Sequence, residues 1–369
     1  MKNLVLIGGG HAHMVTLSKL DTFISKGYKV TVIQPSDHHY YSGMGPGMLG
    51  GTYQAEDIRF ATKRLVESKG GTFVKAYASR IDPMKRLVHL RESDETLSYD
   101  VLSCNAGSYV VQDVIEDSGS NVFTSKPIEK LTEAKETIVE QLSAGVSSIA
   151  VIGGGAAAVE IVGNIHQLCK KQVRRPPTIR LFCGRNFMSG KPRRVKSLVR
   201  KLLLGKGIEI IEKGYVKKVV AGEITVENDT TYRADIIFQA TGVRPSALFS
   251  RSGVEVGPGG GLKVNEFLQS TSHPQIFGGG DCIYFTDQPL DKVGVYAVRQ
   301  NEVLYNNLMA ALEGQPLERF KPGGDYLVIY NLGDGEGVLS KWSIAFSGRI
   351  VFWLKNYIDR KFINKFQSN

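Results

Sequence analysis

The chain has few cysteines and no apolar run long enough to cross a membrane. Its 369 residues include only 4 cysteines, and none forms a CxxC pair, which argues against a disulfide scaffold and a cysteine-rich structural metal site. The most apolar stretch, residues 148–163, is interrupted by glycines and carries Glu160, so it does not predict a membrane-spanning helix. Met1 and Lys2 lead directly into a short apolar strand and glycines, a pattern unlike a signal peptide. We therefore expect a reducing compartment, no metal site, and at most peripheral contact with a membrane.

The chain has fewer acidic than basic residues. Lys and Arg number 46 against 36 Asp and Glu, a formal net charge of +10, which favours acidic surfaces or acidic substrates as partners. The densest basic run, residues 191–206, has no aromatic side chains interleaved for stacking on bases, so we expect no nucleic-acid partner. This run is typical of a solvated helix face, and it also suits attraction of NADPH or of a membrane surface.

Glycine, by contrast, is abundant, and two matching loops stand out. Residues 4–7 and residues 149–152 are short apolar strands, and each leads into three glycines and then a helix. Strand, glycine turn and helix together are typical of a dinucleotide site, because the glycines allow the backbone to approach a pyrophosphate. The third glycine of the pattern is replaced by His13 in the first loop and by Ala158 in the second. A strand, turn and helix without a ligand is the alternative for either copy alone.

The acidic residue that commonly binds a ribose hydroxyl after the second strand of such a unit is missing from both copies. Gln34 ends the strand that follows the first loop, and its amide is able to hydrogen-bond a ribose. After the second loop the corresponding strand is followed by Cys183, Gly184 and Arg185. An Arg at this place suits a 2′-phosphate, so NADPH is a candidate substrate, with a plain surface role for Arg185 as the alternative.

Three further strands end in small residues, within residues 99–108, 234–245 and 275–281. With the two glycine loops, this order of motifs resembles the two-dinucleotide-binding-domain flavoproteins of the pyridine nucleotide-disulfide oxidoreductase superfamily. Within that superfamily it is most similar to the group of type II NADH dehydrogenases and sulfide:quinone oxidoreductases. The loop of residues 41–47 and the C-terminal tail also resemble a flavoprotein module that is sometimes joined to selenide, water dikinase.

The resemblance implies an α/β fold with two Rossmann-like domains and an amphipathic helical tail. The FAD domain is expected to be split, with residues 1–113 and 240–315 on either side of an inserted NAD(P)-binding domain, residues 114–239. Residues 316–369 are expected to form the region for membrane association or dimerisation. The FAD contacts that the resemblance implies are Gly8, Gly9, Gly10, His11, Ala12, Gln34, Gly43, Met44, Ala106, Gly107, Gly280 and Asp281. The other expected cofactor contacts, including those of NAD(P)H, are Gly153, Gly155, Ala156, Arg185 and Gly242.

The same resemblance suggests catalytic residues. Glu160 matches a glutamate beside the nicotinamide and flavin, with an acid on the helix surface as the alternative. Lys292 stands at the start of a helix whose N-terminus points at the flavin in the family, where it or the helix dipole would stabilise the reduced flavin; a solvated Lys is the alternative. Gln300 matches one of two glutamines that line a quinone pocket, and Tyr296 takes the place of the other. Trp353, on the tail, is expected to contact the quinone as well.

The tail itself, residues 348–366, has the pattern of an amphipathic helix. Its apolar residues follow the spacing of one helical face and its basic residues occupy the others, which is typical of a helix lying in the interface of an anionic membrane. The alternative is a helix packed on the protein's own core or on a second subunit, as in a homodimer. We therefore expect a peripheral protein at the cytoplasmic face of the membrane.

The function that these features predict is that of a FAD-dependent NAD(P)H:quinone oxidoreductase. A sulfide:quinone oxidoreductase, or an oxidase of another inorganic sulfur or selenium compound, is the alternative. It requires two cysteines beside the flavin, and no motif places any two of Cys104, Cys169, Cys183 and Cys282 together. A flavoprotein with a vestigial nicotinamide site is a third interpretation, since the ribose-binding acid is missing.

Overall fold

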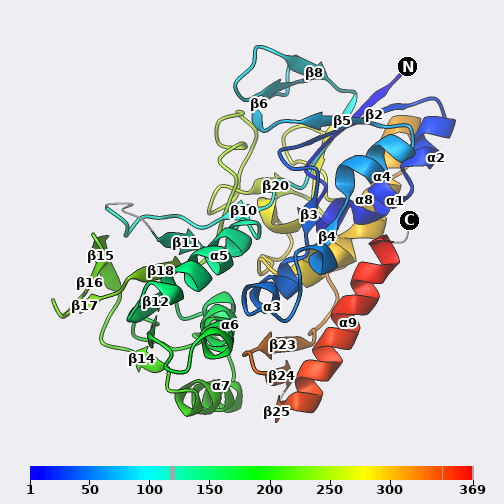
Figure 1. Cartoon of the computed structure of the whole chain (residues 1–369). Helices are drawn as coiled ribbons and strands as arrows, with labels where there is room; N and C mark the ends of the chain where they lie inside the picture. Colours follow the sequence, from blue (N-terminus) through cyan, green and yellow to red (C-terminus); the bar gives the residue numbers. More distant parts are fainter. Residues whose placement is uncertain (117–120, 343, 368–369) are drawn as a thin grey trace.

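Two parallel five-stranded sheets and a small C-terminal sheet organise the molecule (Figure 1). The computed structural model describes residues 1–116, 121–342 and 344–367. The predicted α/β class with two Rossmann-like units is confirmed by these sheets. Strands of parallel sheets are buried on both faces by helices and therefore read as continuous apolar runs, as residues 4–7 and 149–152 do.

The first sheet combines strands from the beginning of the chain with one strand from far downstream. All of its neighbouring strands run parallel, and the downstream strand β21 joins the sheet edge beside β9. In order the strands are β21 (Ile276–Gly278), β9 (Val101–Cys104), β1 (Asn3–Ile7), β2 (Lys29–Gln34) and β5 (Thr72–Lys75). The surrounding helices are η1 (His11–His13), α1 (Met14–Ser18), α2 (Leu20–Ser25), α4 (Thr62–Ser68) and α8 (Gly294–Glu313).

The second sheet is formed entirely by residues between these two segments, and it too is parallel throughout. Its strands in order are β11 (Val122–Thr124), β18 (Ile236–Gln239), β12 (Ser148–Ile152), β13 (Thr178–Phe182) and β14 (Glu209–Ile211). Its helices are α5 (Lys130–Ser143), α6 (Ala156–Gln172) and α7 (Arg193–Gly205).

Each parallel sheet carries an antiparallel three-stranded extension. In the first half of the chain it consists of β6 (Ala78–Asp82), β7 (Leu87–Leu90) and β8 (Thr96–Ser98). In the second it consists of β15 (Val216–Val220), β16 (Glu223–Val226) and β17 (Thr231–Arg233). The second extension lies near the carboxyl ends of β13 and β14, where Gly184 and Gly214 form an isolated bridge.

Short paired strands and turns complete the two halves. They are β3 (His39–Tyr40) with β4 (Arg59–Phe60), β10 (Ser108–Tyr109) with β19 (Arg244–Pro245), and β20 (Leu262–Val264) with β22 (Ile283–Phe285). The turns and short helices are η2 (Ser42–Met44), α3 (Gly45–Leu49), η3 (Glu56–Ile58) and η4 (Gly280–Cys282).

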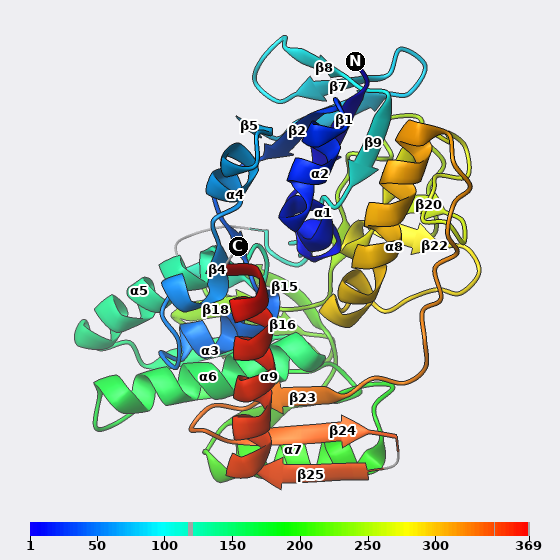
Figure 2. The ribbon, with the colours of Figure 1, turned by 90° about the vertical axis from the view of Figure 1, so that its right-hand side faces the viewer.

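The C-terminal region forms a three-stranded antiparallel sheet and one long helix. The strands are β23 (Val328–Asn331), β24 (Gly337–Lys341) and β25 (Ile344–Gly348), and α9 (Arg349–Gln367) follows them directly. Figure 2 shows α9 running from β25 across the face of this small sheet to the region of β4 in the first half of the chain. The helix thereby joins regions that are far apart in sequence.

The single apolar face predicted for the tail is split in the structure. Val351, Ile363 and Phe366 lie buried against the protein, and Phe362 stacks on His11. The other side of the helix exposes Ile350, Trp353, Tyr357 and Ile358, at 83%, 64%, 54% and 41% respectively. The packing on the protein's own core that we gave as the alternative therefore holds for one face of the helix, whereas contact of the other face with a membrane remains a prediction.

Candidate active site

The first glycine loop lies where no side chain has room. Gly8 has a φ of +84°, and a Cβ there would come within 2.3 Å of the Asn105 carbonyl oxygen; at Gly10 it would come within 2.3 Å of Asn105 Oδ1. The Asn105 side chain donates to the Gly279 carbonyl (2.7 Å) and accepts from the Ala12 amide (3.3 Å). It thereby ties the loop to the ends of β9 and β21. The backbone of the loop is thus the surface that a pyrophosphate is able to approach.

Gln34 orders this loop with its side chain. Its Oε1 accepts from the Gly9 amide (2.9 Å), and its Nε2 donates to the carbonyls of Ser36 (2.5 Å) and His38 (3.0 Å). These bonds use both Nε2 hydrogens and one of the two lone pairs of Oε1, so one lone pair is left for a hydroxyl group. The ribose contact expected of Gln34 remains a prediction. Beyond it lies a hollow of about 500 Å³, lined by Asp37, His38, Ala61, Lys63, Arg64, Glu67 and Ser68.

His13 is a fully satisfied core residue. It is completely buried, and its ring nitrogens lie 2.6 Å from the Gly8 carbonyl and 2.8 Å from Ser103 Oγ. Burial lowers the pKa of His13 to about 4, so the ring is neutral. It fills the place of the third glycine and braces the turn against β9.

His11, two residues earlier, differs from His13 because only one of its two ring nitrogens has a hydrogen-bond partner among the described residues. Nδ1 of His11 lies 3.1 Å from His39 Nε2, whereas His11 Nε2 is buried without a hydrogen-bond partner among the described residues. Burial lowers its pKa to about 4. A buried unpaired ring nitrogen is rare in native proteins, and here it borders the glycine loop. The crowded glycines, the adjoining hollow and this free nitrogen all fit a bound FAD.

Asp281 and its partners form the polar end of the same site. Asp281 Oδ2 accepts from Ser108 Oγ (2.8 Å) and lies 2.5 Å from Lys126 Nζ, and Lys292 donates to the Asp281 carbonyl (2.7 Å). Burial alone would raise the pKa of Asp281, but Lys126 beside it brings the pKa below its ordinary value. Burial also lowers the pKa of Lys292. The structure thus gathers three charged side chains beside Gly280, of which Lys126 was not predicted.

The other predicted FAD and quinone contacts in the half of the chain that forms the first sheet lie in η1, η2 and α8 and after the end of β9. Gln300 is 1% exposed, and its Oε1 accepts from the Gly280 amide (2.7 Å), so it holds the turn that presents Asp281. Tyr296 packs edge-on against Tyr326. Ala12 and Met44 are buried, Gly43 lies in η2, and Ala106 and Gly107 follow β9.

Trp353 is not brought together with Gln300. It lies on the outer face of α9 beside β25 and stacks on Tyr357, whereas Gln300 lies in α8 against η4. Figures 1 and 2 show α8 beside the first sheet and the beginning of α9 beside β25.

The inner face of α9 contributes a buried ion pair, Lys355 and Asp359, which is joined by the neutral hydroxyl of Tyr41 from the loop before η2; we call these three residues the α9 charge cluster. Lys355 Nζ donates to Asp359 Oδ2 (2.8 Å) and to the Gly43 carbonyl (2.8 Å), and the Tyr41 hydroxyl donates to Asp359 Oδ1 (3.0 Å). The side chains of Lys355 and Asp359 are only 11% and 6% exposed. The spacing of four residues between them was a visible signal, but nothing in the sequence showed that this side of the tail faces inward.

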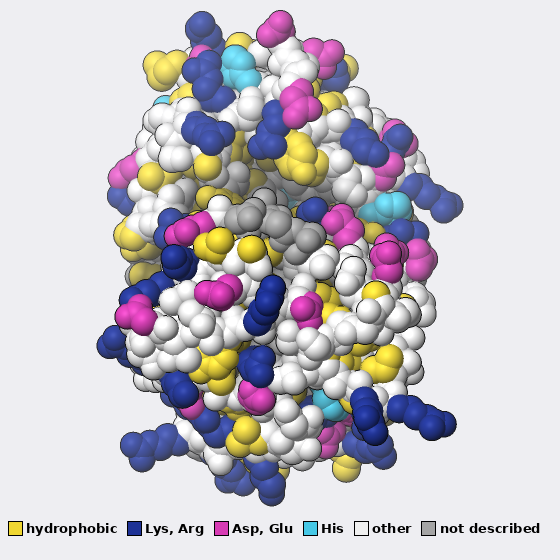
Figure 3. Space-filling view, turned by 60° about the vertical axis from the view of Figure 1, so that its left-hand side comes forward, with side chains coloured by type: hydrophobic (Ala, Val, Ile, Leu, Met, Phe, Trp, Pro, Cys, Tyr) yellow, Lys and Arg dark blue, Asp and Glu magenta, His cyan; other side chains and the backbone are white. Residues whose placement is uncertain are grey.

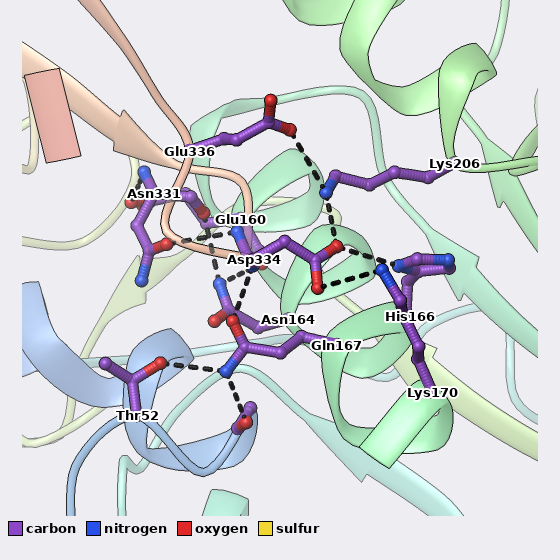
Figure 4. A network of polar contacts seen from close by, with 12 residues as sticks. Thr52, Glu160, Asn164, His166, Gln167, Lys170, Lys206, Asn331, Asp334 and Glu336 are labelled. Atoms are coloured by element: carbon purple, nitrogen blue, oxygen red, sulfur yellow. Dashed lines mark hydrogen bonds and ion pairs between the residues drawn. The ribbon is translucent and has the colours of Figure 1, made fainter. Parts of the chain in front are cut away.

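Glu160 lies next to this cluster. Its Oε1 accepts from the Asn331 amide (2.8 Å) at the end of β23, within the polar network that Figure 4 shows between α6 and the turn from β23 to β24. Burial raises the pKa of Glu160 to about 7, and Lys355 opposes part of that rise. Glu160 is therefore an acid that titrates near neutral pH at the junction of α6, α9 and the C-terminal sheet.

The second glycine loop differs from the first in having room for a side chain at its third glycine, Gly155. Gly153 has a φ of +144°, and a Cβ there would come within 2.2 Å of the Ala240 carbonyl oxygen, whereas a Cβ on Gly155 would meet nothing. Gly155 is the N-cap residue of α6 and has no side chain to cap the helix, and Ala156, the first residue of the helix, is exposed. The free amides of this long helix are accessible to an anion. Gly242 has a φ of +109° and borders the same end of the sheet.

All four cysteines are buried. The structure brings Cys104 and Cys282 together, since Cys282 Sγ lies 3.4 Å from the Cys104 carbonyl oxygen. Burial raises the pKa of Cys282 to about 12 and that of Cys104 well above its ordinary value. Sulfur chemistry needs a thiolate, and these surroundings disfavour one.

In the described residues, 1–116, 121–342 and 344–367, no helix has the length and apolar character needed to cross a bilayer. An exposed apolar surface does run along the outer face of α9 and onto the neighbouring hairpin. It consists of Trp342, Ile344, Phe346, Ile350, Trp353, Tyr357 and Ile358, and we call it the outer apolar surface.

Comparisons with known proteins agree with this geometry. A model of the pyridine nucleotide-disulphide oxidoreductase family matches residues 2–308. A type II NADH:quinone oxidoreductase of Staphylococcus saprophyticus is 26% identical, over 99% of this chain and 96% of that protein. The corresponding protein of Staphylococcus aureus is 24% identical, with the same shares covered.

Two solved structures show the same fold. The sulfide:quinone oxidoreductase of Aquifex aeolicus superposes with a TM-score of 0.82 at 19% identity, over 100% of this chain and 92% of that chain. NDH2 of Plasmodium falciparum, in complex with NADH, has a TM-score of 0.82 at 15% identity, with 99% and 97% covered.

Proposed function

The chain belongs to the pyridine nucleotide-disulphide oxidoreductase family, and we propose that it is a FAD-dependent NAD(P)H:quinone oxidoreductase. The observation that carries this proposal is the pair of glycine loops, each at the carboxyl end of its own parallel sheet. The similarity to NADH:quinone oxidoreductases over nearly the whole chain supports it. We assign residues 1–113 and 240–315 to the FAD domain, residues 114–239 to the NAD(P)H domain, and residues 316–369 to the membrane-facing region.

FAD held in this site would supply the two-electron redox chemistry that links a nicotinamide to a quinone. The first glycine loop, His11 and the Asp281 turn hold the cofactor. The open second loop and the N-terminus of α6 bind the pyrophosphate of NAD(P)H. Lys126 and Lys292 provide positive charge beside the site.

Reduction of a quinone to a quinol also requires two protons. Glu160 is placed to donate one, because its raised pKa of about 7 leaves a substantial fraction of the carboxyl group protonated near neutral pH, and because it lies beside the α9 charge cluster. Lys355, Asp359 and Tyr41 form a hydrogen-bonded chain from α9 to the loop around Gly43. We propose that this chain reprotonates Glu160 and that the quinone enters from the side of α9.

Sulfide oxidation with quinone as acceptor is the alternative chemistry, and one fold neighbour carries that name. The burial and raised pKa values of the cysteines argue against it. A steady-state assay separates the two: NADH should be consumed only when a water-soluble quinone is present, and sulfide with the same quinone should give no quinol. Quinol formation from sulfide but from neither nicotinamide would reverse the assignment.

The pH dependence of quinone reduction should report on Glu160. Its raised pKa of about 7 means that the carboxyl group holds its proton below pH 7 and has lost it above, so the rate of flavin reoxidation by quinone should fall as the pH rises through 7. In Glu160→Gln, which keeps an acceptor for the Asn331 amide, we expect a rate about 100-fold lower at pH 6 and no titration near 7. Stopped-flow measurement of flavin absorbance checks this, and an unchanged profile in the variant would exclude Glu160 as the donor.

The outer apolar surface is the proposed contact with an anionic membrane, at the cytoplasmic face and without a spanning helix. In the double variant Ile350→Ser, Trp353→Ser, binding to anionic vesicles should fall at least tenfold, since burying one large apolar side chain contributes roughly 1.5–3 kcal/mol. These substitutions leave the packed inner face of α9 intact, which truncation of the tail would not. Tyr77→Ser, Met84→Ser is the matched control, because these exposed side chains lie away from α9, at 53% and 84% exposure. Equal sedimentation of both variants with vesicles would count against this surface.

A further inference from the structure

A hollow at the carboxyl ends of β13 and β14 lies where the adenosine ribose of a dinucleotide binds in this kind of unit. It measures about 340 Å³, and its lining residues are Arg185, Glu212, Lys213, Gly214, Glu227 and Asn228. The residue type that usually selects the ribose, an acid at the end of the second strand, is absent, since Cys183 and Gly184 follow β13. The lining nevertheless contains two carboxylates, and both come from elsewhere in the chain.

Glu227 is held in this hollow by the β15–β17 sheet. It follows the last residue of β16, and its Oε2 accepts from the Tyr215 amide (3.0 Å) and from Arg185 Nε (3.1 Å). The Tyr215 amide, with Arg185 and Lys217 nearby, lowers the pKa of this carboxyl group. Glu227 therefore places a fixed negative charge against the guanidinium group of Arg185, the residue that we predicted to bind a 2′-phosphate.

The second carboxylate of the lining, Glu212, is also paired with a cation. Glu212 pairs with Arg200 of α7 (2.6 Å) and lies 3.4 Å from the Phe187 amide. Figure 3 shows one whole face of the molecule, on which Lys and Arg side chains are intermingled with Asp and Glu side chains. A 2′-phosphate entering the hollow would meet two carboxylates as well as the cation of Lys213. A 2′-hydroxyl, in contrast, is able to donate a hydrogen bond to one of the carboxylates.

We infer that Glu227 selects NADH over NADPH by occupying Arg185 and presenting a carboxylate to the ribose 2′-hydroxyl. This inference rests on the proposed function, because it assumes that the second glycine loop binds a nicotinamide dinucleotide. It replaces the preference for NADPH that Arg185 alone suggested. It also explains how the unit operates without an acid at the end of β13.

The test compares three variants by two independent measurements. Glu227→Gln keeps an acceptor for the Tyr215 amide and removes the charge. Arg185→Ala, Glu227→Gln removes the freed cation as well. Glu223→Gln, an exposed position of β16 outside the hollow, is the matched control for loss of one negative charge. The measurements are kcat/KM for flavin reduction by NADH and by NADPH, and calorimetric affinities for 2′,5′-ADP and 5′-AMP.

The parent protein should prefer NADH and 5′-AMP. Glu227→Gln should shift the NADPH to NADH ratio, and the 2′,5′-ADP to 5′-AMP ratio, by about tenfold or more towards the phosphorylated ligand, since a charge-assisted contact becomes available. The double variant should lose this shift, and Glu223→Gln should not show it. A parent that prefers the phosphorylated ligand, or a Glu227→Gln variant with unchanged ratios, would overturn the inference. If neither nucleotide reduces the flavin, the proposed function fails, while the two affinities still decide the role of Glu227.

Discussion

The variant Gly10→Val is expected to purify with little or no FAD. A Cβ at Gly10 would come within 2.3 Å of Asn105 Oδ1, and Asn105 is the side chain that ties the loop to β21. A branched side chain must therefore displace Asn105 or enter the space of the pyrophosphate, and both outcomes remove the surface that binds FAD. The ratio of flavin absorbance to protein absorbance after purification measures the effect.

The second loop provides a matched control for this experiment. Gly155 has the same place in its loop and a similar extended backbone conformation, with φ and ψ of −91° and −172° against −75° and −175° at Gly10. A Cβ at Gly155 would meet nothing, so Gly155→Val should keep its full flavin content and lose affinity for NAD(P)H instead. Full flavin content in Gly10→Val, or equal loss in both variants, would contradict the assignment of the two loops.

The variant Lys355→Met should be strongly destabilised, because it leaves the Asp359 carboxylate buried without its cation. Removing one partner of a buried ion pair typically costs about 3–5 kcal/mol. Replacing both partners, in Lys355→Met, Asp359→Leu, should restore most of this stability, although Tyr41 then lacks its acceptor. Denaturant unfolding, followed by fluorescence in the presence of excess FAD, compares the variants.

An exposed ion pair supplies the control. Lys130 and Glu133 in α5 lie 3.0 Å apart with side chains 50% and 59% exposed, so Lys130→Met should cost less than about 1 kcal/mol. If Lys355→Met were no more destabilising than Lys130→Met, the α9 charge cluster would not be desolvated as the structure shows. If the double variant kept its stability but reduced quinone more slowly, the chemical role of the α9 charge cluster would be separated from its structural role.

Local sequence patterns identified the central strand of each parallel sheet, because residues 4–7 and 149–152 are uniformly apolar and lead into glycines. The return of the chain to the first sheet followed from the family resemblance, and the pairing of β21 with β9 is not visible in local sequence. The contacts between side chains far apart in the chain were the hardest feature to predict from the sequence. Nothing near Arg185 in the sequence indicates that Glu227, 42 residues later, is its partner, because a long-range contact depends on how the β15–β17 sheet folds back.

The tail shows the same limit. Its amphipathic spacing predicts a helix, and α9 is one, but the pattern treats every apolar residue as belonging to one face. In the structure a buried Lys and Asp share the inner face with Phe362, while Ile350 and Trp353 are exposed. A charged pair four residues apart is usually a surface feature, and only the packing partners distinguish a buried one. For this reason the α9 charge cluster was missed.

Electrons are expected to pass from a nicotinamide to a quinone through a flavin held by the first glycine loop. An anaerobic titration of the purified protein, with NADH, NADPH and sulfide added separately while flavin absorbance is recorded, tests this transfer. About one equivalent of NADH should bleach the flavin, a water-soluble quinone should then restore its absorbance, and sulfide should leave it unchanged. A flavin that is bleached by sulfide and by neither nicotinamide nucleotide would contradict the proposed function.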